Sequence, residues 1–106
     1  MANVIEIDDS NFTKEVKLSE KAVVLVDFHA TWCGPCQMMG PVIKELSEEA
    51  DGKYIVGKIN IDEEAALAER FNIMSIPTIK IFKDGKEVAS SLGVVSKGKI
   101  KEMMML

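Results

Sequence analysis

The sequence contains little of what a metal centre or a disulfide framework requires. Its 106 residues include two cysteines and one histidine. A closed zinc site needs about four ligands, so these residues are too few to build one. Both cysteines lie in the stretch Trp32-Cys33-Gly34-Pro35-Cys36, where a disulfide would stabilise the fold by only roughly 2 kcal/mol. A reversible dithiol is the leading interpretation, with metal binding and coincidence left open until the neighbouring elements are known.

Long apolar runs and dense basic clusters are also missing. The longest unbroken apolar run, Ala22 to Val26, is far too short to span a bilayer, so we expect no membrane partner. A net charge of −4 without a cluster of Lys and Arg argues against nucleic-acid binding. The first residues show no basic segment followed by an apolar stretch, so we expect no signal peptide. We therefore expect a cytoplasmic, reducing location, where a cysteine pair is more often catalytic or metal-binding than structural.

The remaining composition is that of an ordinary globular protein. Apolar residues make up 47% of the chain and charged residues 28%. The sequence has no internal repeats, linkers or low-complexity tracts. A chain of this length can form one hydrophobic core without cross-links, so we expect a single domain over residues 1–106.

The hydrophobic pattern predicts about five strands and about four helices. The predicted strands cover residues 4–7, 22–29, 54–61, 78–82 and 87–92, the last two joined by a hairpin turn at Asp84-Gly85. The predicted helices are one that follows capping residues 9–11 and faces Phe12, Val16 and Leu18 inward, one over 35–50, one capped by Asp62 that runs to Phe71, and one from Ser96 to Leu106.

These elements define the fold class as α/β. Strand, helix and strand over residues 22–61 form a right-handed βαβ unit, the neighbourhood in which a Cys-x-x-Cys pair is a redox motif. The result is a central mixed sheet with helices on both faces. In the helix over 35–50, the side chains of Met39, Val42, Ile43 and Leu46 share one face, and Pro41 predicts a kink.

The start of this helix gives the two cysteines different tasks. Pro35 suits a first helical turn because its fixed φ and missing N–H are tolerated there. Cys33 then lies at the helix N-terminus, where free amide N–H groups and the helix dipole favour a thiolate. We expect Cys33 to be the attacking sulfur and Cys36 to be the buried resolving thiol.

From about residue 4 to the C-terminus, the chain resembles the thioredoxin family. The resemblance rests on Trp-Cys-Gly-Pro-Cys at residues 32–36, Val26-Asp27-Phe28, Pro41, Lys58, Ile76-Pro77-Thr78 and Gly93. It implies the thioredoxin fold and the reduction of protein disulfides through a reversible Cys33–Cys36 dithiol and a mixed-disulfide intermediate. It also implies a monomer that donates electrons to client proteins. Because the chain has no nucleotide or flavin motif, we expect no bound cofactor and recharging by a separate thioredoxin reductase.

The remaining candidate site residues follow from the hydrophobic pattern and from the family resemblance. Asp27 ends an apolar run in a strand predicted to be covered on both faces, so we expect it to be buried, with a raised pKa, and to exchange a proton with Cys36. The resemblance implies that Lys58 lies near Asp27 as a partial counter-charge and that Ile76-Pro77 is a cis peptide bond facing the cysteines. The substrate-binding residues that it implies are Trp32, Gly34, Pro35, Ile76, Pro77, Gly93 and Val94.

Some positions depart from the family pattern. His29 stands where the family usually has an aromatic residue, and we interpret it as a neutral replacement at a half-buried position, not as a ligand or a base. Gln37 replaces a usual lysine, and Gly40 a common alanine. Met74 belongs either to the contact surface around Cys33 or to the core. The methionines at 103–105 are interpreted as a packed helix end because consecutive helical positions point in different directions.

Two other functions remain open on the sequence. A disulfide oxidant or isomerase would use the same chemistry in the opposite direction, although the Gly-Pro dipeptide resembles the reducing members. A redox-silent binding module would only dock a partner enzyme and would stay active with both cysteines replaced by serine.

Overall fold

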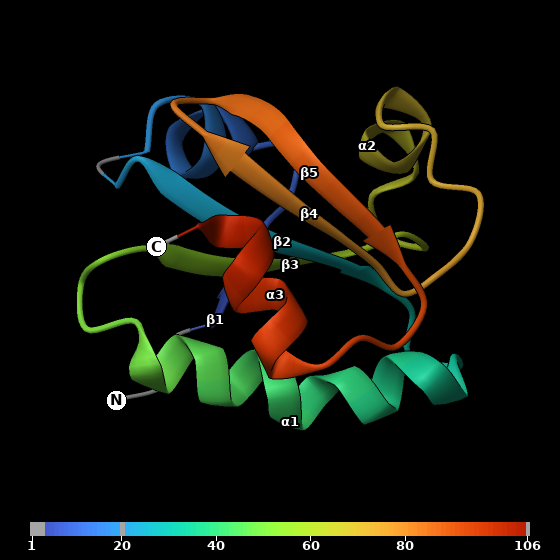
Figure 1. Ribbon diagram of the computed structural model, residues 1–106. Helices are drawn as coiled ribbons and strands as arrows, with labels where there is room; N and C mark the ends of the chain where they lie inside the picture. Colours follow the sequence, from blue (N-terminus) through green and yellow to red (C-terminus); the bar gives the residue numbers. More distant parts are fainter. Residues whose placement is uncertain (1–3, 20, 106) are drawn as a thin grey trace.

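The computed structural model describes residues 4–19 and 21–105, which form a five-stranded sheet with helices on both faces (Figure 1). The strands are β1 (Val4–Glu6), β2 (Val23–His29), β3 (Ile55–Asn60), β4 (Thr78–Lys83) and β5 (Lys86–Leu92). The helical elements are the π-helical turn η1 (Thr13–Lys17), α1 (Gly34–Glu49), α2 (Ala65–Arg70) and α3 (Lys97–Met104). No helix within these two ranges is long and apolar enough to cross a membrane.

The strands lie in the order β1-β3-β2-β4-β5. β3 runs parallel to both β1 and β2, whereas β4 is antiparallel to β2 and β5 is antiparallel to β4. Figure 1 shows α1 and α3 together on one face of the sheet, with α2 and η1 on the other. The predicted mixed sheet, the helices on both faces and the βαβ unit are confirmed.

β2 is the central strand, and its alternate side chains enter two different cores. Leu25 packs with buried residues of α1 and α3, whereas Val24 and Val26 pack with those of η1 and α2. Because successive side chains of a strand point to opposite faces, Asp27 and His29 lie on the same face as Leu25. The end of β2 therefore places two polar side chains beneath α1.

α1 buries the face that its sequence predicts. Met39, Ile43 and Leu46 are buried, and Val42 is partly buried against the same core. The helix continues through Pro41 to Glu49. The kink at Pro41 stays a prediction.

The first predicted helix is a π-helical turn of five residues, η1. The Leu18 N–H donates to the Thr13 carbonyl at 2.8 Å, five residues back, which is the bonding of a π-helical turn. Phe12 and Val16 face the core as predicted, but Leu18 is 75% exposed, so its inward assignment is wrong. The turn ends before Leu18, and an α-helical spacing does not apply to that side chain.

The predicted cap of α2 is also wrong. α2 begins at Ala65, and its N-cap residue Glu64 makes no side-chain capping hydrogen bond. Asp62 instead accepts a hydrogen bond from Trp32 Nε1 at 2.7 Å. Asn60 Oδ1 accepts from the Asp62 N–H at 2.9 Å and so holds the turn that precedes the helix.

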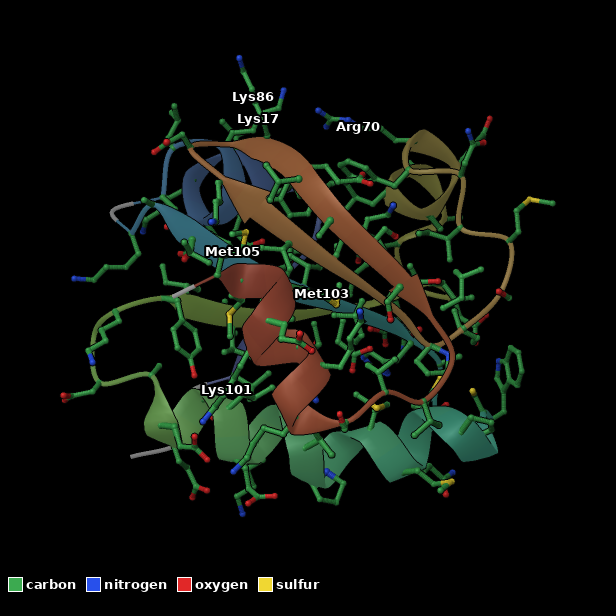
Figure 2. All side chains as sticks on the ribbon, in the orientation of Figure 1. Lys17, Arg70, Lys86, Lys101, Met103 and Met105 are labelled. Atoms are coloured by element: carbon green, nitrogen blue, oxygen red, sulfur yellow. The ribbon has the colours of Figure 1, made fainter. Side chains whose placement is uncertain are left out.

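The hairpin between β4 and β5 is confirmed. Asp84 and Gly85 both have positive φ, at 51° and 81°, as a two-residue type I′ turn requires. The turn packs against the end of η1, and Lys17 and Lys86 are found at the same end of the molecule in Figure 2.

α3 begins as predicted and ends early. Ser96 Oγ accepts a hydrogen bond from the Lys99 N–H at 3.1 Å, which confirms the predicted cap. The helix ends at Met104, because Met105 adopts a left-handed conformation with φ 50°. Met104 is buried and Met105 is exposed, so the consecutive methionines point in different directions. The predicted end at Leu106 lies outside the described residues.

Candidate active site

The two cysteines lie at the N-terminus of α1, as predicted. Cys33 is the N-cap residue, and its Sγ accepts a hydrogen bond from the Cys36 N–H at 3.2 Å. Pro35 occupies the first turn, where it requires no hydrogen bond. Both cysteines are free and buried. A negative charge on Cys33 Sγ would therefore meet an amide donor and the positive end of the helix.

The loop before β4 lies against Cys33. The thiol of Cys33 lies 3.8 Å from the carbonyl oxygen of Ile76, to which it donates. The Ile76-Pro77 bond is cis, as expected. The Gly93 N–H donates to the Pro77 carbonyl at 2.8 Å and ties the end of β5 to this loop. Figure 1 shows the start of α1, the start of β4 and the end of β5 at one edge of the molecule.

Exposed apolar side chains lie close in sequence to these contacts. Trp32, next to Cys33, is 68% exposed, and Val94, next to Gly93, is 48% exposed. Met74 is 92% exposed, which excludes its assignment to the core. Exposed apolar side chains next to Cys33 and Gly93 are available for contact with another protein.

Asp27 is buried, as predicted, and it lies beneath α1. It is 4% exposed, and its Oδ1 has no hydrogen-bond partner among the described residues. Burial raises the pKa of Asp27 to about 7, and the charge of Lys58 opposes that rise. Asp27 and Lys58 face each other across β2 and β3 in the sheet register. The Lys58 ammonium lies 3.4 Å from Glu6 Oε1, so its ion-pair partner is a surface carboxylate.

A cavity of about 300 Å³ connects Asp27 with the second cysteine. Asp27, Cys36 and Lys58 all line it. Burial, with a contribution from the hydrogen bond to Cys33, raises the pKa of Cys36 above that of an ordinary thiol. Cys36 is therefore protonated at neutral pH, and a proton acceptor would be needed to form its thiolate. The buried carboxylate is a suitable acceptor, because its pKa lies close to neutral pH.

Two residues make contacts that the sequence does not predict. His29 lines the same cavity, and its Nε2 is buried without a hydrogen-bond partner among the described residues. The two-residue spacing from Asp27 on one strand could have indicated this position. Asp62, which was assigned to a helix cap, instead holds the Trp32 indole. A long-range contact of this kind leaves no local signal in the sequence.

The fold and the paired thiols at a helix N-terminus define a protein of the dithiol–disulfide exchange class. The family model described as Thioredoxin matches residues 3–105. A thioredoxin from Chlorobaculum thiosulfatiphilum is 48% identical over 95 residues, which cover 90% of this chain and 87% of that protein. A thioredoxin from Buchnera aphidicola subsp. Acyrthosiphon pisum is 42% identical over 104 residues, with 98% and 95% covered.

A solved structure gives the same result. A mutant thioredoxin from Halobacterium salinarum NRC-1 superposes with a TM-score of 0.86 at 33% identity, covering 97% of this chain and 88% of that one. The chain belongs to the thioredoxin family. It is a thiol-disulfide oxidoreductase that acts on proteins bearing disulfides.

Proposed function

We propose that this chain is a protein-disulfide reductase in which Cys33 attacks and Cys36 resolves. The Cys33 thiolate attacks one sulfur of a client disulfide, a new bond joins Cys33 Sγ to that sulfur, and the other client sulfur leaves as a thiolate and takes a proton from solvent. The observation that supports this most directly is the position of Cys33 Sγ, which accepts from the Cys36 N–H at the start of α1.

Cys36 completes the exchange. Its thiol gives a proton to the Asp27 carboxylate across the cavity, and the resulting thiolate attacks Cys33 Sγ. A Cys33–Cys36 disulfide forms, the bond between Cys33 and the client breaks, and the second client sulfur leaves. The client gains two electrons and the dithiol is oxidised. Lys58 is a positioning residue, because its charge opposes the rise in the Asp27 pKa and keeps part of that carboxylate ionised.

The client docks on the surface around Cys33. The backbone of Ile76 offers strand-like pairing to an extended client peptide, and such pairing does not depend on the sequence of the client. The cis bond at Pro77 and the Gly93 contact hold that loop beside the sulfur. The apolar contacts are supplied by Trp32, Gly34, Pro35 and Val94, all of which are exposed.

The oxidised chain is reduced again by a separate thioredoxin reductase. We propose that the protein is a monomer located in the cytoplasm. We also propose that residues 1–106 form one domain. The observation in favour of a single domain is that residues 4–19 and 21–105 contribute to one continuous sheet with a core on each face.

Trapping of the mixed disulfide tests the proposed function. Cys36→Ser should accumulate a covalent complex with a disulfide-bearing protein such as insulin, because the attack by Cys33 proceeds and its resolution does not. The matched control is Cys33→Ser, which should trap little because Cys36 is protonated near neutral pH. Non-reducing electrophoresis and mass mapping of the joined peptides give the result. A complex formed mainly through Cys36 would contradict the assignment.

A further inference from the structure

The cavity beneath α1 is lined by the imidazole of His29, which has no role in the proposed exchange. Its lining includes Asp27 and His29 from β2, Cys36 and Lys44 from α1, and Lys58 from β3. A volume of about 300 Å³ that these polar side chains line in part is enough to hold several water molecules. The imidazole therefore shares one cavity with the Cys36 thiol and the Asp27 carboxylate.

Two polar atoms on this cavity lack a partner within the described parts of the chain. They are Asp27 Oδ1 and His29 Nε2. A buried polar atom left unpaired destabilises the fold, and water in the cavity would satisfy both atoms. His29 as a whole is half-buried, so the residue has contact with both the cavity and solvent. His29 is therefore placed between the space that Asp27 lines and bulk water.

The charge state of the ring suits proton acceptance. Burial, followed by the charge of Lys58, lowers the pKa of His29, while Glu6 and Glu63 oppose that change. The imidazole is therefore neutral at neutral pH. It also stays neutral somewhat below the pH at which Asp27, with a pKa of about 7, becomes protonated. Asp27 and His29 can thus accept a proton over different ranges of pH, and both line the cavity together with the Cys36 thiol.

We propose that His29 is a proton-relay residue that receives the proton of Cys36, through water in the cavity, when Asp27 is already protonated. The inference rests on the proposed function. Cys36 transfers its proton along the water to His29 Nε2, and its thiolate attacks Cys33 Sγ. The Cys33–Cys36 bond forms as the client sulfur leaves. The imidazolium then releases the proton to solvent on its exposed side.

A stopped-flow reaction with dithiobis-nitrobenzoate, which is a small aromatic disulfide, isolates the step. The first release of nitrothiobenzoate reports attack by Cys33, and the second reports attack by Cys36 on the mixed disulfide. The rate of the second release, measured in the wild type, in His29→Gln and in His29→Phe over about pH 5 to 8, is the readout. Glutamine keeps a hydrogen-bonding group and phenylalanine keeps a ring, but neither takes up a proton.

In both variants the second release should slow about tenfold between pH 8 and pH 6, because about a tenth of Asp27 remains ionised one unit below its pKa of about 7. In the wild type the same release should slow less, since His29 still accepts the proton. At pH 8 the three proteins should agree, since Asp27 is then ionised. The first release and the urea midpoint of unfolding should change little.

Identical pH profiles of the second release in the wild type and both variants would overturn the relay. A loss in His29→Phe with full retention in His29→Gln would also overturn it, because the ring would then serve only as a hydrogen-bonding group. Failure of the proposed function gives a different pattern. A wild type that shows no second release would contradict resolution by Cys36 itself.

Discussion

At Asp27, the strand that forms the centre of the sheet also removes a carboxylate from water. The side chain is 4% exposed and its Oδ1 has no partner in the described structure, so burial raises the pKa of Asp27 to about 7. The folded protein therefore holds a proton at pH values where the unfolded chain has released it. Asp27 therefore contributes least to the free energy of unfolding at the pH values at which it is ionised.

Asp27→Asn should stabilise the reduced protein at alkaline pH and slow the resolving step. The contribution of a group with a raised pKa is full below the unfolded value of 3.8 and is lost as pH rises toward about 7. The gain in the free energy of unfolding should therefore be small near pH 4 and reach about 2 to 4 kcal/mol at pH 8. Urea unfolding at several pH values measures it. A gain that is the same at every pH would contradict the buried, ionisable carboxylate.

Single residues were predictable where a local pattern determines their environment. The burial of Asp27 follows from the apolar run that it ends, and the half-buried position of His29 was also expected. The sequence did not show that His29 reaches the cavity of Asp27 or that Asp62 binds the Trp32 indole. Those contacts join β2 to α1 and the loop after β3 to the loop before α1. They depend on how elements pack.

At the scale of elements, the β4–β5 turn is held against η1 through a glycine. A Cβ on Gly85 would lie 2.7 Å from the backbone oxygen of Lys17, and the φ of Gly85 is 81°. Gly52 has a similar φ of 76°, but a Cβ there would meet nothing within 4 Å. Both glycines adopt a positive φ, but only at Gly85 would a Cβ come close to the backbone of Lys17.

Gly85→Ala should therefore destabilise the protein more than Gly52→Ala. The left-handed conformation costs a non-glycine residue about 1 to 2 kcal/mol, which applies to both variants. The contact with Lys17 adds a second cost in Gly85→Ala alone, so its loss should be larger by about 1 kcal/mol or more. Denaturant unfolding of both variants gives the difference. Equal losses would show that the turn does not press against η1.

The helices and strands could be predicted because hydrophobic side chains repeat with a different period in each. The predicted bounds of all five strands and α1 agree with the structure to within one residue, and the Asp84-Gly85 turn is typical of a hairpin. At η1 the sequence predicts a helix with α-helical spacing, and the structure has a π-helical turn instead. Its π-helical bonding accompanies the burial of Phe12 and Val16 against the sheet, which is a tertiary contact that local spacing does not encode.

The whole molecule is organised around β2, with one core on each side. α3 is joined to α1 by ion pairs of Lys97 and Lys101 with Glu49, and Figure 2 shows Lys101 extending from α3 toward α1. Sequence periodicity predicts a mixed sheet but not its full strand order, because that order depends on contacts between distant segments. The thioredoxin resemblance supplied the overall fold that periodicity alone could not.

The direction of electron flow is a property of the whole molecule, and the reduction potential measures it most directly. The protein is equilibrated with glutathione buffers of graded composition, and the fraction of Cys33–Cys36 disulfide is determined by thiol labelling and mass spectrometry. A reductase should give a potential more negative than about −220 mV, on the reducing side of disulfide isomerases at about −180 mV. A value near the −120 mV or so of a strong disulfide oxidant would contradict the account.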